Sequence, residues 1–325
     1  MAAQTATWGY TLSSEEFGPR DLVEQACLAE EAGFEFVTVS DHYHPWTETQ
    51  GQSPFVWTTI GGVAARTNKL RVGTGVTCPI IRYHPTIVAQ AAATASSLSN
   101  GRFFLGVGTG EWLNEHVVGG AWPSIAVRRE MLEEAVDLMR QLWTGDTVDH
   151  RGEHYTVENA RIFTVPSGEI AVVSAASGPE SAQAAAAYAD GLWSTAPNAE
   201  IVDAYRGAGG KGPVYGQVTV CIAGDEDQAR KTALEVWPNA GIPGQLSQDL
   251  ATWTHFQQVS QLVTADHVAE RIACGPDPGV VVEMTHKYLD AGFDHIHFHQ
   301  VGPDQRGFVE FWQTRLAPAL TPASR

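Results

Sequence analysis

The sequence predicts a single closed (β/α)8 barrel over residues 1–325, and three observations support this fold class. Short runs rich in β-branched and aromatic residues alternate with amphipathic helical segments along the chain. Two stretches, "EEAGFEFVTVSDH" (30–42) and "LDAGFDHIHFHQ" (289–300), run alike from a helix end through Gly and Phe into a strand. The alternative fold, a doubly wound sheet, would carry a GxGxxG turn after its first strand, but "GYTLSSEEFGPR" follows a different pattern.

Eight candidate strands follow one another along the chain: Thr7–Leu12, 35–41, 70–76, 102–108, 170–175, 191–195, 214–222 and 295–301. Amphipathic segments between them predict helices over 20–32, 85–98, 127–143, 181–189 and 279–291. In the first of these helices, Leu22, Ala26 and Ala29 recur at helical spacing. The glycine in each of the two AGF sequences is the residue expected to end the preceding helix.

Two stretches interrupt the alternation of predicted strands and helices. Residues 145–164 predict a β-hairpin insertion, and residues 237–264 form a long insertion rich in Pro, Gly and Gln. Long insertions on a compact domain are often lids, and the pattern leaves a lid and a plain surface loop equally open. Neither stretch has the composition of a linker.

The composition limits the partners of the chain. A formal net charge of -17 disfavours nucleic acid and anionic membrane surfaces, because they would be repelled. The four cysteines are widely spaced without a CxxC pair, and the sequence shows neither a signal peptide nor an apolar run long enough for a membrane span. We therefore expect reduced thiols and a cytoplasmic protein.

The stretch "VSDHYHPW" (39–46) ends the second predicted strand and carries the first candidate chemistry. Asp41 could orient the ring of His42 as a base, because barrel enzymes place working residues at the carboxyl ends of strands. His42 and His44 also form a His-x-His pair that could share a metal, but Pro45 ends the extended conformation there. Later strand ends supply mainly Gly, Thr and Ser, with further histidines only in "HIHFH", so we favour proton transfer and expect no metal.

Two further strand ends complete the candidate site. "GVGTGE" (106–111) places Glu111 after a glycine-rich turn, where backbone amides can approach a planar or anionic ligand. Opposed residues such as His42 and Glu111 suit proton management on either side of a redox ring. "VSAASGPES" (173–181) leads into a helix whose free amides could hold a phosphate in this acidic protein.

Taken together, several motifs resemble the coenzyme F420-dependent glucose-6-phosphate dehydrogenase group of the bacterial luciferase-like barrels. These motifs are "VSDHYHPW", "GTGVTCP", "RYHPTIVAQAAAT", "LGVGTGEWLNE", "LMRQLWTGD" and "AASGP". The resemblance extends from "GY" at 9–10 to "FHQVGPDQRGF" at 298–308. It implies a barrel that binds a deazaflavin, coenzyme F420, at the strand ends and transfers a hydride to or from it. It also suggests a homodimer.

The resemblance also implies roles for individual residues. His42 would take the substrate hydroxyl proton, Trp46 would line the site, and Glu111 would protonate the deazaflavin ring as the hydride arrives. Asp41 would contact the cofactor, and Gly75–Val76 would be joined by a non-proline cis peptide bond behind the ring. The other implied cofactor contacts are Cys78, Gly108, Thr109, Asn114, Ala175, Ala176, Ser177 and Gly178.

The sequence departs from the family at the sugar-phosphate end. Glu15, Thr195 and Arg271 match family residues near the substrate, but the two positions where the family has lysines hold Asn198 and Ser247, the latter followed by Gln248. Loss of two cations removes charge-assisted hydrogen bonds to a phosphate dianion. We therefore expect an alcohol or the matching ketone as substrate rather than glucose 6-phosphate.

Four alternatives remain open on the sequence. They are an F420-dependent sugar-6-phosphate dehydrogenase, an FMN-dependent luciferase-like monooxygenase, a metal-dependent hydrolase, and a cofactor-binding protein without catalysis.

Overall fold

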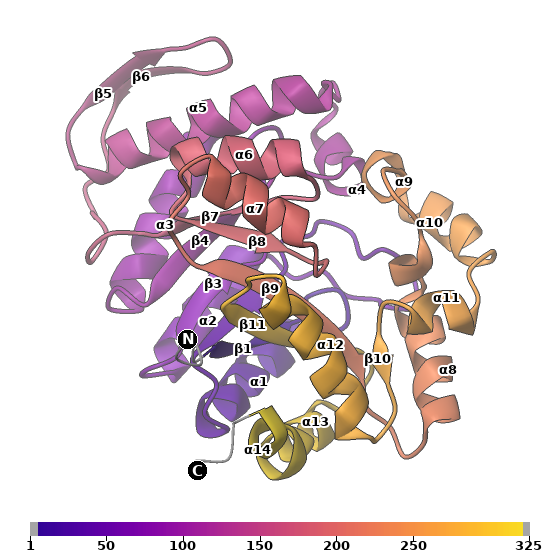
Figure 1. Ribbon diagram of the computed structural model, residues 1–325. Coiled ribbons are helices and arrows are strands. Elements are labelled where there is room, and N and C mark those ends of the chain that lie inside the picture. Colours follow the sequence, from indigo (N-terminus) through magenta and orange to yellow (C-terminus); the bar gives the residue numbers. More distant parts are fainter. Residues whose placement is uncertain (1–5, 321–325) are drawn as a thin grey trace.

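A computed structural model describes residues 6–320 and shows a closed barrel of parallel strands (Figure 1). Eight strands follow the order β1-β2-β3-β4-β7-β8-β9-β11, and pairing of β11 with β1 and of β8 with β9 closes the ring. These strands are β1 Thr7–Leu12, β2 Phe36–Val39, β3 Arg71–Thr74, β4 Phe103–Val107, β7 Val172–Ala175, β8 Gly191–Ser194, β9 Val214–Cys221 and β11 His295–Gln300. The predicted fold class is confirmed.

Helices surround the barrel. The long ones are α1 Pro19–Glu31, α2 Val56–Arg66, α3 Pro85–Leu98, α5 Ile125–Trp143, α6 Pro179–Tyr188, α7 Ala199–Gly207, α8 Glu226–Val236, α10 Trp253–Ser260 and α12 Pro278–Asp290. The short ones are α4 Trp112–Glu115, η1 His116–Val118, η2 Pro238–Gly241, α9 Leu246–Asp249, α11 Ala265–Ala269, α13 Gln305–Phe311, the π-helical turn η3 Trp312–Leu316, and α14 Ala317–Leu320. No helix in the described part of the chain is both long and apolar enough to cross a membrane.

Glycines in the strands make room for large rings inside the barrel. A Cβ on Gly9 would lie 2.4 Å from the ring of Phe36, and a Cβ on Gly73 would lie 2.3 Å from the ring of Phe104. Both rings pack against Tyr215, and all three are fully buried. The lumen at this level is therefore filled by aromatic side chains rather than left as a pore.

The repeated AGF sequences end helices as predicted. Gly33 and Gly292, each one residue beyond the C-cap of α1 or α12, adopt positive φ angles of 87° and 94°. This left-handed conformation favours glycine because it has no Cβ. The next residues, Phe34 and Phe293, are buried and begin the return to the sheet.

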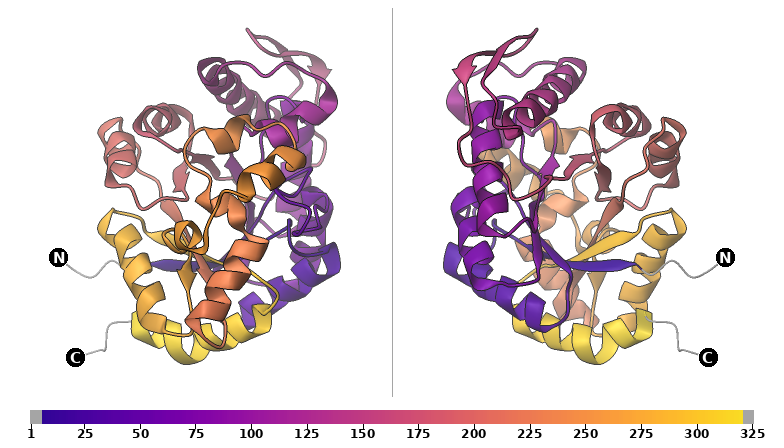
Figure 2. Two further views of the ribbon diagram at one scale, coloured as in Figure 1. Left: turned by 90° about the vertical axis from the view of Figure 1, so that its right-hand side faces the viewer. Right: turned by 90° about the vertical axis from the view of Figure 1, so that its left-hand side faces the viewer.

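Both insertions have structure of their own. Strands β5 (Val148–Arg151) and β6 (Thr156–Ala160) form the predicted hairpin, which lies beyond α5 and away from the barrel axis (Figure 1). Residues 237–264 contain η2, α9 and α10, and Figure 2 (left) shows this segment in orange in front of the barrel. A short strand, β10 (Ala273–Cys274), follows the second insertion and pairs only with β9.

Six of the eight barrel strands end one or two residues before the predicted carboxyl end, whereas β1 and β7 end as predicted. The second strand ends at Val39 rather than residue 41, and the third ends at Thr74 rather than residue 76. Asp41 and Val76 lie beyond the paired strands because the chain there turns to line a cavity. The prediction extended these strands into the functional segments that follow them.

Candidate active site

A cavity of about 300 Å³ lies at the carboxyl ends of the barrel strands. It is lined by Asp41, His42, Gly75, Val76, Cys78, Gly108, Thr109, Gly110, Glu111, Asn114, Glu115, Ala175, Ala176, Ser177, Trp193, Ser194, Thr195, Ala196, Gln217 and Gln248. The segments after β2, β3, β4, β7 and β8 all contribute. The sequence had indicated each of these strand ends.

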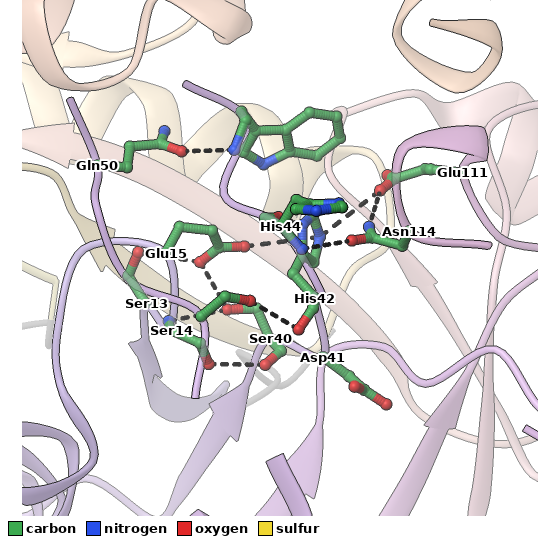
Figure 3. A network of polar contacts seen from close by, with 12 residues as sticks. Ser13, Ser14, Glu15, Ser40, Asp41, His42, His44, Gln50, Glu111 and Asn114 are labelled. Carbon is green, nitrogen blue, oxygen red and sulfur yellow. Dashed lines mark hydrogen bonds and ion pairs between the residues drawn. The ribbon is translucent and has the colours of Figure 1, made fainter. Parts of the chain in front are cut away.

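The His42 ring lies between two carboxylates (Figure 3). Its Nε2 is 3.6 Å from Glu15 Oε1 and 3.5 Å from Glu111 Oε2, while its Nδ1 is 3.3 Å from the main-chain oxygen of His44. A carbonyl oxygen can only accept, so this contact favours the tautomer with hydrogen on Nδ1. Nε2 is then free to accept a proton.

The surrounding groups fix this arrangement. Glu15 is buried, and its Oε2 accepts a hydrogen bond of 2.7 Å from the Ser40 hydroxyl. Asn114 accepts from the Tyr43 amide at 2.8 Å and donates to Glu111 Oε2 at 3.3 Å (Figure 3). The loop after β2 and the segment after β4 are thereby tied together beside His42.

Glu111 has the environment of a proton donor. Its side chain is 32% accessible, and it lines the cavity. Burial is the largest influence and raises the pKa of Glu111; the charge of His42 lowers it, and Glu15 raises it. A raised pKa keeps the carboxyl protonated to a higher pH than usual, as a general acid requires.

Asp41 lies in a second polar cluster that the sequence did not reveal. It accepts hydrogen bonds from Thr77 (2.7 Å), from Arg82 (2.9 Å) and from Tyr83 (3.3 Å). Arg82 also approaches Glu115, with 3.7 Å between Nε and Oε1. Asp41 is therefore held in one position at the cavity wall.

Glu115 is fully buried and lines the same wall. Burial raises the pKa of Glu115 to about 7, although the main-chain amide and the charge of Arg82 lower it. Its Oε1 has no hydrogen-bond partner. The desolvation of this carboxyl thus outweighs its pairing with Arg82.

The cavity floor is made by glycine and small side chains. The peptide bond between Gly75 and Val76 is cis, as the family resemblance implies. A Cβ on Gly108 would lie 2.8 Å from Val76 Cγ2, and one on Gly75 would lie 2.8 Å from the Trp193 ring. Only glycine at these positions leaves the floor flat, as a planar ring would need.

The predicted phosphate-binding turn is divided between the cavity and its rim. Ala175, Ala176 and Ser177 line the cavity, whereas Gly178 is the N-cap residue of α6. The main chain at the start of α6 thus adjoins one end of the cavity. This placement is compatible with the predicted role but does not test it.

The predicted substrate residues are more dispersed. Thr195 lines the cavity, and its main-chain oxygen accepts a hydrogen bond from Tyr288. Burial raises the pKa of Tyr288, and the charge of the exposed Arg271 lowers it to a smaller extent. The Asn198 side chain caps α7 by accepting from the Glu200 amide.

In the second insertion, Gln248 lines the cavity, but its neighbour Ser247 does not. The Ser247 hydroxyl donates to the main-chain oxygen of Gly244. Ser247, at the second family lysine position, thus lies outside the cavity lining, whereas the residue that follows it lies at the site.

Trp46 joins His42 to the second insertion. Its ring lies 5.0 Å from the His42 ring and 4.9 Å from the ring of Phe256 in α10, which is fully buried. Gln50 extends the connection, because its amide accepts from the Trp46 main chain and donates to Val236 and Asn239. The insertion is packed onto the site as a lid would be.

His44 makes structural contacts. Its Nδ1 lies 3.2 Å from the main-chain oxygen of Leu113, and its ring stacks on that of His116. In the part of the chain that the structure describes, no group of three or more His, Cys, Asp or Glu side chains is arranged to hold a metal.

Sequence reasoning missed several cavity or wall residues, among them Arg82, Glu115 and Gln217. A signal existed for two of them. Glu115 ends the "GTGEWLNE" motif, four residues after Glu111. Gln217 lies two residues after the buried Tyr215 and therefore on the same, inner face of β9. The pairing of Arg82 with Asp41 has no sequence signal, because it depends on tertiary structure.

Comparison with known proteins identifies relatives over nearly the whole chain. The sequence model of the luciferase-like monooxygenase family matches residues 1–295. An F420-dependent glucose-6-phosphate dehydrogenase from Rhodococcus hoagii (strain 103S) is 38% identical, with 96% of this chain and 97% of that protein aligned. The enzyme of that name from Mycobacterium tuberculosis (strain ATCC 25618 / H37Rv) is 37% identical, with 96% and 97% aligned.

Two solved structures are similar as well. An F420-dependent secondary alcohol dehydrogenase in complex with an F420–acetone adduct has a TM-score of 0.89 and 31% identity, with 98% of this chain and 99% of that chain covered. A coenzyme F420-dependent tetrahydromethanopterin reductase from Methanopyrus kandleri has a TM-score of 0.79 and 21% identity, covering 98% and 100%. The second likeness concerns the fold alone.

Proposed function

This chain belongs to the luciferase-like monooxygenase family, and we propose that it is a coenzyme F420-dependent oxidoreductase acting on an alcohol or the matching ketone. The observation that carries the proposal is the position of His42 Nε2 between Glu15 and Glu111 at the edge of a glycine-floored cavity. This geometry provides a base and an acid on one reacting centre.

The residues present fit a deazaflavin. A flat floor at Gly75, Val76 and Gly108 would support the ring, Asp41 would contact it, and the main chain of 175–178 would face its phosphate end. The cofactor supplies hydride transfer when bound, so the protein needs only to position the substrate and to move protons.

His42 acts as the base in alcohol oxidation. The His44 carbonyl retains hydrogen on Nδ1, so Nε2 accepts the hydroxyl proton of the substrate. The Glu15 carboxylate then stabilises the imidazolium, and Glu111 does so from the other side once it has given up its own proton. Glu111, whose pKa is raised by burial, donates a proton toward the cofactor. In ketone reduction these transfers run in reverse.

The cavity favours an uncharged substrate. Among the described residues that line it, none is Lys or Arg, while Asp41, Glu111 and Glu115 are acidic. The two positions expected to hold phosphate-binding lysines are Asn198, which caps a helix, and Ser247, beside the cavity-lining Gln248. An F420-dependent sugar-6-phosphate dehydrogenase remains the alternative, because relatives at 37–38% identity carry that name.

The test is a titration of purified protein with F420 and, separately, with FMN, followed by a screen of alcohols, ketones and sugar phosphates for a change in F420 absorbance. We expect F420 binding and turnover of neutral alcohols. FMN binding without F420 binding would support the monooxygenase alternative and contradict the proposal. Strong turnover of glucose 6-phosphate would refute the substrate assignment while leaving the cofactor assignment intact.

Three further predictions belong to the proposal. We propose that residues 1–325 form one domain, that the chain is a homodimer, and that it works in the cytoplasm without nucleic acid or membrane partners. The free state of all four cysteines supports a reducing compartment. Sedimentation analysis would test the dimer.

A further inference from the structure

The cavity carries polar side chains that the proposed proton transfers do not use. Thr195 follows β8, Gln217 lies on β9 and Gln248 lies on α9, and all three line the cavity. Counted around the ring of eight barrel strands, β8 is the fourth strand from β2 in either direction, so Thr195 lies across the barrel from His42. We call Thr195, Gln217 and Gln248 the polar wall.

The cofactor leaves the polar wall to the substrate. The floor assigned to the deazaflavin is formed by Gly75, Val76 and Gly108, in the segments after β3 and β4. Its phosphate end is assigned to residues 175–178, at the end of β7. Neither part of the cofactor site involves β8, β9 or α9, so these elements remain available to a substrate whose reacting hydroxyl lies at His42.

The polar wall has hydrogen-bonding groups without partners. The Gln217 Nε2 lies 3.4 Å from Thr219 Oγ1 and 3.5 Å from His299 Nδ1, so this amide is held by its donor end. In the described part of the chain, no hydrogen-bond partner contacts Gln217 Oε1, the Gln248 side-chain amide or the Thr195 hydroxyl. The wall therefore offers amide acceptors, an amide donor and a hydroxyl, all of them uncharged.

These free groups discriminate between substrates of similar size. A substrate that fills the cavity displaces water from them, and affinity is lost wherever the substrate does not replace the hydrogen bonds of that water. A monohydroxy alcohol uses its hydroxyl at His42 and leaves the polar wall unpaired, at a cost of about tenfold in affinity for each group. A compound with further hydroxyls can both donate to the wall and accept from it.

The charges around the cavity indicate that these further groups are neutral. Among the described residues that line it, none is Lys or Arg, whereas Asp41, Glu111 and Glu115 are acidic. An anion that is taken out of water beside carboxylates and without a cation is strongly disfavoured. Hydroxyl groups match the polar wall without this cost.

On the basis of the proposed function, we propose that the substrate is an uncharged polyhydroxylated compound, a polyol or an unphosphorylated sugar, whose further hydroxyls bind Thr195, Gln217 and Gln248. In its oxidation, the reacting oxygen gives its proton to His42 Nε2 and the reacting carbon gives a hydride to F420, so the CH–OH group becomes a carbonyl group. The hydroxyls at the polar wall keep their hydrogens and position the substrate.

Matched compounds test this substrate class. Glucose and tetrahydropyran-2-ol share a reacting centre and ring but differ in the other hydroxyls, as do myo-inositol and cyclohexanol. With F420, we expect kcat/KM for the polyhydroxylated member of at least one pair to exceed that of its partner by about 100-fold or more, because at least two wall groups would otherwise stay unpaired. Equal or faster use of the monohydroxy member in both pairs would overturn the proposal.

Two variants separate binding at the polar wall from a merely structural role. Gln217→Leu and Gln248→Leu should each lower kcat/KM for the polyhydroxylated compound by about tenfold, mainly through KM, and should leave that of its monohydroxy partner unchanged or higher. Gln245→Leu is the matched control, because Gln245 precedes α9, lies outside the cavity lining and makes no side-chain cap hydrogen bond. An equal loss for both compounds in both variants would refute the proposal.

A binding measurement needs no turnover. Saturation-transfer difference NMR on the F420-loaded protein detects weak ligands, and the probes are xylitol, sorbitol, myo-inositol and glucose. We expect a signal for at least one probe in the wild type, and a weaker signal for that probe in Gln248→Leu but not in Gln245→Leu. F420 binding without a signal from any probe would refute the substrate class alone. Failure of F420 to bind would instead refute the proposed function.

Discussion

The two walls of the cavity are built differently. The wall that follows β2, β3 and β4 holds buried charges in fixed contacts, such as Asp41 with Arg82 and Thr77, above a floor where glycine is required. The opposite wall, from the end of β8 and the second insertion, offers uncharged groups such as Thr195 and Gln248 on segments with few hydrogen bonds into the site.

The difference between the two walls indicates that one determines the reaction and the other determines which substrate is bound. A fixed, charged wall suits one cofactor and one pattern of proton transfer, because reacting groups must be positioned before the reaction. A neutral wall on an insertion can change its side chains without disturbing the barrel. We therefore expect changes on the first wall to affect rate and cofactor binding, and changes on the second wall to affect which substrate is used.

The largest effect is expected at His42. His42→Ala should lower kcat for alcohol oxidation by about 10²- to 10⁴-fold, because it removes the base, while F420 affinity is retained. His44→Ala is the matched control, since only the main-chain oxygen of His44 contacts the His42 ring. Steady-state kinetics and an F420 titration measure both variants. An equal loss in both would favour a role for the His-x-His pair as a unit.

Ionisation of the buried Glu115 on the first wall should lower the free energy of unfolding. Its pKa in the folded protein is about 7 against an ordinary value of 4.5, so the folded state binds the proton more tightly than the unfolded state. Its contribution to the free energy of unfolding therefore falls as pH rises from about 4.5 to about 7, by about 3 kcal/mol in total. Glu115→Gln cannot ionise and should gain stability relative to the wild type over this range.

Urea unfolding of both proteins across this pH range measures the difference. Glu30 provides a control of opposite sign. Partial burial is the largest single influence and raises the pKa of this carboxyl, but the main-chain amides of Lys69, Leu70 and Asn68 together outweigh it and lower the pKa. Stability from Glu30 is lost as pH falls, so Glu30→Gln should lose its disadvantage toward low pH. Parallel stability curves for Glu115→Gln and the wild type would contradict the raised pKa of Glu115.

One methyl group added at Gly108 in the cavity floor should weaken the binding of F420. Gly108→Ala places a Cβ 2.8 Å from Val76 Cγ2, so Val76 must move. Overpacking of this kind costs about 1–3 kcal/mol, and an F420 affinity about tenfold lower corresponds to about 1.4 kcal/mol. Fluorescence titration measures the affinity. Gly207→Ala in α7, where the added Cβ would meet no atom within 4 Å, should bind F420 as the wild type does.

The smallest effect is expected on the second wall. Gln248→Lys adds a cation to the cavity and should raise kcat/KM for a sugar phosphate relative to a neutral alcohol by up to about tenfold, because a charge-assisted hydrogen bond contributes about 1.5–3 kcal/mol before desolvation. Gln248→Met, similar in length and uncharged, is the control. An unchanged ratio in Gln248→Lys would show that the phosphate end of a substrate does not reach this wall.

The sequence predicted the barrel well because its signals are local. Periodic apolar runs mark the eight strands, and glycines such as Gly33 and Gly292 end helices through their own φ angles. Strand β10 escaped prediction because it has two residues and pairs with a single neighbour. The predicted ends of β2 and β3 extended two residues too far, because Ser40–Asp41 and Gly75–Val76 continue the chain toward the cavity without pairing in the sheet.

The site was predictable where motifs carry it and not where tertiary contacts do. His42, Glu111 and Asp41 were found from motifs, and the structure brings them to one cavity, although their roles remain predictions. The Asp41–Arg82 pair joins residues 41 positions apart, and nothing in the spacing selects Arg82 over another cation. Likewise, the three-dimensional course of α9 determines that Gln248, and not the predicted Ser247, lines the cavity.

The contact of Trp46 with Phe256 has a consequence for the ancestry and redesign of this barrel. Because α10 is anchored beside His42 through this ring pair and neighbouring apolar side chains, and η2 through the hydrogen bond of Gln50 to Asn239, residues 237–264 form a cassette with several defined attachments. A chimaera that exchanges the cassette but keeps Trp46 and an aromatic residue at position 256 retains the anchor. Evolution could diversify this barrel by the same exchange, replacing the roof of the site while the catalytic strands remain unaltered.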